Sequence, residues 1–211
     1  MRLELPPLAL VPLLAACATA PPPSPLEGAL RGLEARPAWL FGAERCPADV
    51  MPPAEAAFRP LERLCETDLP TCLERCQGSE ASACYWAALR VQALHRDEAA
   101  SEALFLRACA LGVVSGCTNR AAGMTKNGTE GAAATRCAVR TFERTCHAND
   151  PWGCTMFGFH LMKGLGIDRD PDRAARILEL ACVRFGEEDP ACARARELME
   201  ELGQAKRGLN I

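Results

Sequence analysis

Long apolar runs, an excess of one charge and aromatic residues are all scarce in this sequence. No apolar run approaches the ~20 residues that a membrane-spanning helix needs, so we expect none. The chain has 24 Lys and Arg against 27 Asp and Glu, a net charge of −3 that offers no basic surface to nucleic acid. Aromatic residues make up 5% of the chain, which predicts a core of modest apolar area.

Sequence motifs of catalysis are missing as well. No Cys-x-x-Cys pair occurs, although thiol redox enzymes use one with a depressed pKa. No serine is followed three residues later by lysine, the spacing that puts a lysine one helical turn from a nucleophile. The three histidines, His95, His147 and His160, are 52 and 13 residues apart, too scattered for a zinc site. We therefore expect no catalytic residue, no metal and no cofactor.

The N-terminus has the features of an export signal. Leu5 to Ala16 form an apolar block of signal-peptide length, and Leu14-Ala15-Ala16-Cys17 resembles a bacterial lipobox. This predicts a signal peptide over 1–16 and a lipid anchor on Cys17; ordinary secretory cleavage after Ala20 is the alternative. Removing Cys17 from 13 cysteines leaves an even number that can all pair. By the lipoprotein resemblance, Ala18 after the cysteine implies the outer membrane, with the protein facing the periplasm.

Prolines divide the remaining chain. Of the 16 prolines, 12 lie within residues 1–60 and none lies between Thr71 and Asp150. Residues 17–53 are therefore expected to form a Pro-rich tether and an irregular segment, and the rest of the chain is free to be helical.

Cysteines, by contrast, are abundant and periodic. Four of them step by 33, 37 and 36 residues, and each has a partner eight or ten residues later. The pairs are Cys76 with Cys84, Cys109 with Cys117, Cys146 with Cys154, and Cys182 with Cys192. Helix stop and start signals such as Asp150-Pro151 fall between partners, so the period predicts helical hairpins with a disulfide across each turn. A structural disulfide is favoured over zinc or redox chemistry.

The other cysteines allow several connectivities. Cys65 and Cys72 can close a shorter hairpin, which leaves Cys46 and Cys137 to pair by default, and three connectivities exist for four cysteines. We expect an N-terminal cap hairpin over 54–79 and a repeat array over 80–207. Helices are expected over 54–65, 80–94, 98–110, 115–125, 132–147, 152–163, 172–185 and 190–204.

Aligning the units on their cysteines predicts the packing between helices. In the first three units the fourth residue after the second cysteine is small and the seventh is apolar, so one helix face is buried. On the second helix, a large residue stands four positions before the next cysteine and a small one eight before it. The aligned residues are Ala88, Ala121, Gly158; Val91, Met124, Leu161; Phe105, Phe142, Leu178; and Ser101, Ala138, Ala174.

Residues 150–182 look like one complete Sel-one-like repeat, a relative of the tetratricopeptide repeats. The matching features include Gly158, the Gly164-x-Gly166 loop, Ala174 and Ala181-Cys182. The flanking cysteine pairs resemble the cysteine-rich secreted bacterial subfamily, and the likeness covers roughly residues 70–205. The resemblance implies an all-α, disulfide-stapled αα-hairpin solenoid. It also implies an alternative function, that of an enzyme that binds and hydrolyses β-lactams, because this activity has been associated with the subfamily.

The missing catalytic motifs favour a binding scaffold over that β-lactamase-like enzyme. In a hairpin solenoid the first helix of each pair generally lines the concave side. By that analogy the expected binding groove contains Trp86, Arg90, Asn119, Arg120, Phe157 and His160. The alternative is that Trp86 and Phe157 simply pack between repeats. The expected partner is a protein or peptide of the cell envelope, with the membrane reached through the lipid alone.

Overall fold

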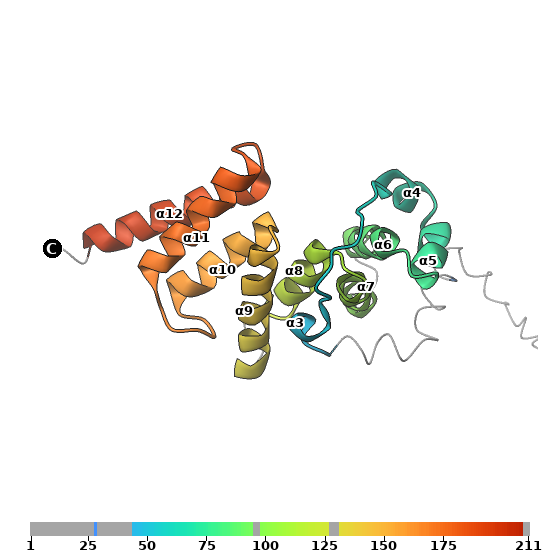
Figure 1. Cartoon of the computed structure of the whole chain (residues 1–211), viewed down its shortest axis with the longest axis horizontal. Helices are drawn as coiled ribbons and strands as arrows, with labels where there is room; N and C mark the ends of the chain where they lie inside the picture. Colours follow the sequence, from blue (N-terminus) through green and yellow to red (C-terminus); the bar gives the residue numbers. More distant parts are fainter. Residues whose placement is uncertain (1–27, 29–43, 95–97, 127–130, 209–211) are drawn as a thin grey trace, which may run out of the picture.

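The computed structural model describes residue 28 and residues 44–94, 98–126 and 131–208. The expected signal peptide, Cys17 and most of the expected tether lie outside this part of the chain. The described residues form ten α-helices and no strand, and consecutive helices from α4 onward pack against each other (Figure 1). The helices are α3 (Pro47–Val50), α4 (Glu62–Thr67), α5 (Leu69–Gln77), α6 (Ala81–Ala93), α7 (Glu98–Ala110), α8 (Val114–Gly123), α9 (Ala132–His147), α10 (Pro151–Lys163), α11 (Pro171–Phe185) and α12 (Pro190–Gly208). The all-α, disulfide-stapled hairpin array is confirmed.

Asp–Pro pairs start the helices of the C-terminal part. Asp150 accepts a hydrogen bond from the backbone N–H of Gly153 at 2.7 Å, and Asp170 accepts one from Arg173 at 2.8 Å. A proline follows each aspartate at the first helical position, where its missing N–H costs nothing. α10 ends at Gly164, whose φ of 72° lies in the left-handed region that suits glycine.

A disulfide joins the two helices of each hairpin across the turn between them. The four pairs that the spacing predicts are disulfides in the structure, with Cα atoms 4.3 to 4.6 Å apart. They link α5 to α6, α7 to α8, α9 to α10, and α11 to α12. Of the open connectivities, the structure contains Cys65–Cys72 between α4 and α5, and Cys46–Cys137 across a sequence separation of 91. Disulfides in this number indicate an oxidising, extracytoplasmic compartment.

Small residues face large ones between the packed helices. A Cβ atom at Gly158 would lie 2.6 Å from Cγ of Leu178, so α10 and α11 approach as closely as a glycine allows. The aligned core residues are buried, except that Met124 is half-buried. Buried apolar side chains form two clusters, one running from Cys65 to Val113 and the other from Ala121 to Leu202. The molecule therefore has two cores that meet at α8.

One expected helix is wrong. Residues 55–61 of the expected 54–65 helix have no regular secondary structure, and α4 begins at Glu62. Pro60 explains the difference, since it lacks an N–H donor and disfavours helical backbone at the preceding Arg59. The other seven expected ranges are helical. The cap hairpin is formed by α4 and α5.

The segment before α4, residues 46–61, lies across the hairpins and is called the strap here. The N–H of Ala56 donates to the carbonyl of Gly112 at 3.0 Å, and the N–H of Arg59 donates to Oγ of Ser82 at 2.9 Å. Gly112 has a φ of 98°, and a Cβ there would lie 2.8 Å from the Ala56 nitrogen. Outside the short helix α3, backbone N–H groups of the strap thus find partners in the array.

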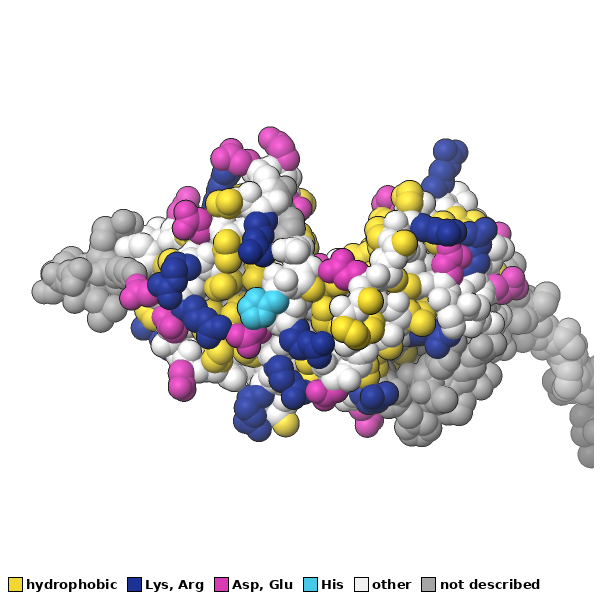
Figure 2. All heavy atoms as spheres, in the orientation of Figure 1, with side chains coloured by type: hydrophobic (Ala, Val, Ile, Leu, Met, Phe, Trp, Pro, Cys, Tyr) yellow, Lys and Arg dark blue, Asp and Glu magenta, His cyan; other side chains and the backbone are white. Residues whose placement is uncertain are grey.

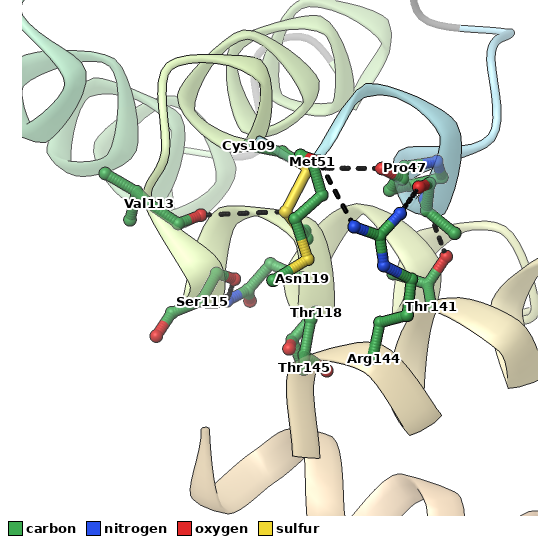
Figure 3. Close-up of a disulfide and its surroundings, with 12 residues drawn as sticks. Pro47, Met51, Cys109, Val113, Ser115, Thr118, Asn119, Thr141, Arg144 and Thr145 are labelled. Atoms are coloured by element: carbon green, nitrogen blue, oxygen red, sulfur yellow. Dashed lines mark hydrogen bonds between the residues drawn. A yellow bond between two sulfur atoms is a disulfide. The ribbon is translucent and has the colours of Figure 1, made fainter. Parts of the chain in front are cut away.

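α3, the helical part of the strap, contacts α7, α8 and α9 (Figures 1 and 3). Arg144 of α9 donates hydrogen bonds to the carbonyl oxygens of Ala48 and Met51. The carbonyl of Pro47 lies 3.6 Å from Sγ of Cys109, beside the α7–α8 disulfide. α3 therefore bridges the elements of the two cores, and the Cys46–Cys137 disulfide fixes it there.

Candidate functional site

Three hollows share residues at equivalent repeat positions. In the hairpins that contain α6, α8 and α10, the hollows are lined by the fifth and the ninth residue after the second cysteine. In the last hairpin, the ninth residue, in α12, lines a hollow. These residues are Leu89, Ala122, Phe159; and Ala93, Lys126, Lys163, Glu201. Equivalent positions of stacked repeats face the same side of a solenoid, and we call this side the inner face. Neighbouring first helices touch, since α10 contacts α8 and α12, and Tyr85 of α6 hydrogen-bonds Asn119 of α8.

The first hollow, called the Trp86 hollow, lies between α4 and α6 and has a volume of about 410 Å³. Trp86, Leu89 and Ala93 supply its apolar side, together with Cys65 of the α4–α5 disulfide. The other lining residues are Glu62, Glu66, Arg90 and Gln92. Its size lies in the range of small-molecule and side-chain sites.

The strap contacts Trp86 beside this hollow. The indole N–H of Trp86 donates to the carbonyl of Arg59 at 3.0 Å, and the ring of Phe58 lies 5.8 Å from that of Trp86. Phe58 also contacts Tyr85 edge-on at 5.6 Å, and 52% of its surface is exposed. In Figure 2 hydrophobic side chains lie along the path of the strap, where the surface has a notch between the N-terminal and the C-terminal helices. The array thus already holds one segment without regular secondary structure at Trp86.

Three charged residues are among the described lining of the Trp86 hollow. Within the described ranges, Glu62, Glu66 and Arg90 make no ion pair with any other residue. Glu62 and Glu66 are one helical turn apart on α4, a spacing that brings like charges onto one face. An arrangement of this kind favours a charged ligand.

The second hollow, of about 240 Å³, lies between α8, α9 and α10 beside His160. His160 is 2% exposed, and its Nδ1–H donates to the carbonyl of Leu165 at 2.9 Å. The rings of Phe142 and Phe159 lie 5.3 and 5.5 Å away. Burial lowers the pKa of His160 below its usual range, although the bond to Leu165 opposes the shift. The histidine is therefore neutral at pH 7.

The third hollow, of about 390 Å³, lies between α10 and α12 and is crossed by internal contacts. Lys163 pairs with Glu201 at 3.2 Å, and Nε of Arg169 donates to the carbonyl of Met162 at 3.1 Å. Since Lys163 and Glu201 pair with each other, this hollow offers a ligand less unpaired charge than the Trp86 hollow does.

The structure separates the residues of the expected groove. Trp86 and Arg90 line one hollow and His160 another, where it is buried rather than partly exposed. Phe157 is buried beneath the guanidinium of Arg173, whose Cζ lies 5.0 Å above the ring, so it packs between helices.

The other two expected groove residues, Asn119 and Arg120, make internal contacts on α8. The Asn119 side chain donates to the carbonyl of Ser115 at 2.8 Å. Arg120 pairs with Glu102 of α7 at 3.1 Å, and both side chains are largely buried. Burial raises the pKa of Glu102, and the charge of Arg120 opposes that shift. Neither residue lines a hollow described above.

Asp150 does more than the expected N-cap. Besides Gly153 it accepts hydrogen bonds from the hydroxyls of Ser115 at 2.6 Å and Thr118 at 2.9 Å, which joins α8 to α10. Burial raises its pKa above the usual range, and these hydrogen bonds act against the rise. The signal for these bonds in the sequence was the pair of hydroxyl residues that flank Cys117.

In the described part of the chain, no three His, Cys, Asp or Glu side chains are close enough together to hold a metal ion. None of the described helices is long and apolar enough to cross a membrane. Comparisons with protein-family models, with curated proteins and with solved structures found no match for this chain.

Proposed function

We propose that this protein is an exported scaffold of Sel-one-like repeats that binds an extended segment of an envelope protein or peptide along its inner face. The observation that carries the proposal is the strap at Trp86. There the array holds a segment without regular secondary structure through the Trp86 indole, the Ser82 hydroxyl and the ring contact between Trp86 and Phe58. Half-exposed aromatic residues and arginines are common anchors of protein interfaces.

The hollows beyond the strap extend this mode of binding. The hollows are lined by residues at equivalent positions of successive repeats. Side chains of a bound peptide would therefore enter them at regular intervals, one side chain to each hollow. The disulfides at the hairpin turns hold the inner face in one shape, which lowers the ordering cost of binding.

Peptide selection tests the proposal. A displayed library of extended peptides is panned against the protein with its disulfides intact, and affinities are measured by calorimetry. We expect Leu89→Asp or Phe159→Asp to weaken binding about tenfold or more, because each puts a charge in a hollow. Val183→Asp is the control, since Val183 is 74% exposed on α11 and lines none of the three hollows. Failure to select any peptide, or equal loss with the control, would contradict the proposal.

The location follows from the same proposal. Cys17 carries the lipid that anchors the protein in the outer membrane, facing the periplasm, and the Pro-rich segment serves as the tether. A Cys17→Ala variant should lose acylation and membrane association. Intact-mass analysis of the native protein that shows no lipid on Cys17 would overturn this assignment.

A further inference from the structure

The Trp86 hollow combines an apolar floor with unneutralised charges of both signs. Trp86 and Leu89 form the floor, Glu62 and Glu66 stand on α4, and Arg90 stands on α6. A purely acidic ligand would meet the two glutamates, and a purely cationic one would meet Arg90. A ligand with one carboxylate and one cationic group complements every charged residue of the hollow.

We propose that the Trp86 hollow binds the C-terminal residue of a peptide that ends in lysine. The proposal rests on the peptide-binding function above and names the partner's chemistry. Arg90 receives the terminal carboxylate, for which its guanidinium fork is suited. Trp86 and Leu89 cover the four-carbon stem, and Glu62 with Glu66 receives the ammonium. Binding the cation also relieves the repulsion between the two glutamates.

The strap explains why a chain end fits better than an internal residue. The Arg59 carbonyl occupies the indole N–H of Trp86, and Phe58 lies beside the ring, so the strap covers part of Trp86 next to the hollow. A peptide that continued along Trp86 in that direction would meet the strap. Since its N–H is engaged, Trp86 presents the ring face, which attracts both the stem and the cation.

Three peptides that differ at one end test the recognition. They are Ala-Ala-Lys as the free acid, the same peptide as its C-terminal amide, and Ala-Ala-norleucine as the free acid. Calorimetry at low salt should show the first binding about tenfold or more tighter than either of the others, as expected when one charged contact is lost. Equal binding of all three would overturn the proposal.

Each variant should remove the difference in affinity between two of these peptides that depends on the substituted residue. Arg90→Gln should make the acid and the amide bind alike while lysine stays preferred over norleucine. Glu62→Gln with Glu66→Gln should abolish the preference for lysine and keep the preference for the acid. Arg63→Gln and Glu74→Gln are matched controls, because both side chains are exposed and neither lines the hollow. If the controls shift binding as much as the variants do, bulk charge explains the result and the proposal fails.

The two proposals fail in different ways. If selected peptides bind along the inner face but show no preference for a terminal lysine, the specificity assigned to the Trp86 hollow is wrong and the scaffold function stands. If no peptide binds the protein at all, the scaffold function itself is wrong. Melting curves of every variant, followed by circular dichroism, separate loss of binding from loss of folding.

Discussion

The two halves of the array hold their helices together by different means. In the C-terminal half, α9–α12, the side chains of Asp150, Asp170 and Asp189 accept backbone hydrogen bonds at the starts of α10, α11 and α12. In the N-terminal half, α4–α7, the N-cap residues Leu61 of α4 and Glu80 of α6 make no side-chain hydrogen bond to the helix backbone, whereas Asp68 caps α5. That half and its junction instead carry the Cys65–Cys72 disulfide and the strap.

A pair of equivalent arginines shows what the strap replaces. Arg107 and Arg144 each stand two residues before the first cysteine of a hairpin. Arg107 donates to the carbonyls of Cys76 and Gln77, in the preceding turn, whereas Arg144 donates to Ala48 and Met51 of the strap. The strap therefore takes the place of a direct contact between repeats. Side-chain caps stabilise the native state, while a disulfide acts largely by restricting the unfolded chain.

Removal of the strap disulfide should have the largest effect. Its two cysteines enclose a sequence separation of 91, for which the loop-entropy relation gives about 4.6 kcal/mol. For the separation of 8 in Cys109–Cys117 the same relation gives about 2.5 kcal/mol. Denaturant titration of Cys46→Ala with Cys137→Ala, against Cys109→Ala with Cys117→Ala, measures both. A larger loss in the second pair would contradict the role given to the strap.

Gly158→Ala should destabilise the C-terminal half by about 1–3 kcal/mol, as overpacking does. The added Cβ would meet Cγ of Leu178 at 2.6 Å. In the N-terminal half the equivalent Ala88 already carries a methyl group and is buried. Thermal melts should therefore show a loss for Gly158→Ala that is smaller when Leu178→Ala makes room. An equal loss with and without Leu178→Ala would show that the contact is not the cause.

Asp150→Ala should cost about 2 kcal/mol, because it removes an N-cap and leaves the hydroxyls of Ser115 and Thr118 without their acceptor. Asp68→Ala should cost less, since Asp68 is an exposed cap whose carboxylate accepts a hydrogen bond from the backbone N–H of Thr71. The measurement is the free energy of unfolding of both variants. Equal losses would mean that the bonds between α8 and α10 contribute nothing.

His160 should make stability depend weakly on pH. Its folded-state pKa lies below the ordinary value of 6.5, so the folded protein binds the proton less well than the unfolded chain does. This contribution is fully present above pH 6.5 and is lost as the pH falls toward the folded-state pKa. His160→Gln should flatten that slope, and His147→Gln, at an exposed histidine, should not. A slope unchanged in His160→Gln would contradict this.

The sequence predicted the hairpins well, because the cysteine period and the Asp–Pro starts are local signals. It failed at 54–65, where Pro60 was given too little weight and the partners of the backbone, such as Gly112, are distant in sequence. His160 was misplaced for a related reason. Its burial depends on the loop residue Leu165, whose carbonyl holds the ring, and helix periodicity does not report such a contact. Glu62 and Glu66 were missed because no pattern in the chain links α4 to Trp86.

Hydrogen exchange of the Cys46→Ala, Cys137→Ala variant, followed peptide by peptide, tests most directly the claim that the strap joins the two halves. We expect protection of the amide hydrogens to fall first in α7, α8 and α9, which α3 contacts, while α11 and α12 keep their protection. Protection lost uniformly along the array, or unchanged at α7–α9, would contradict it.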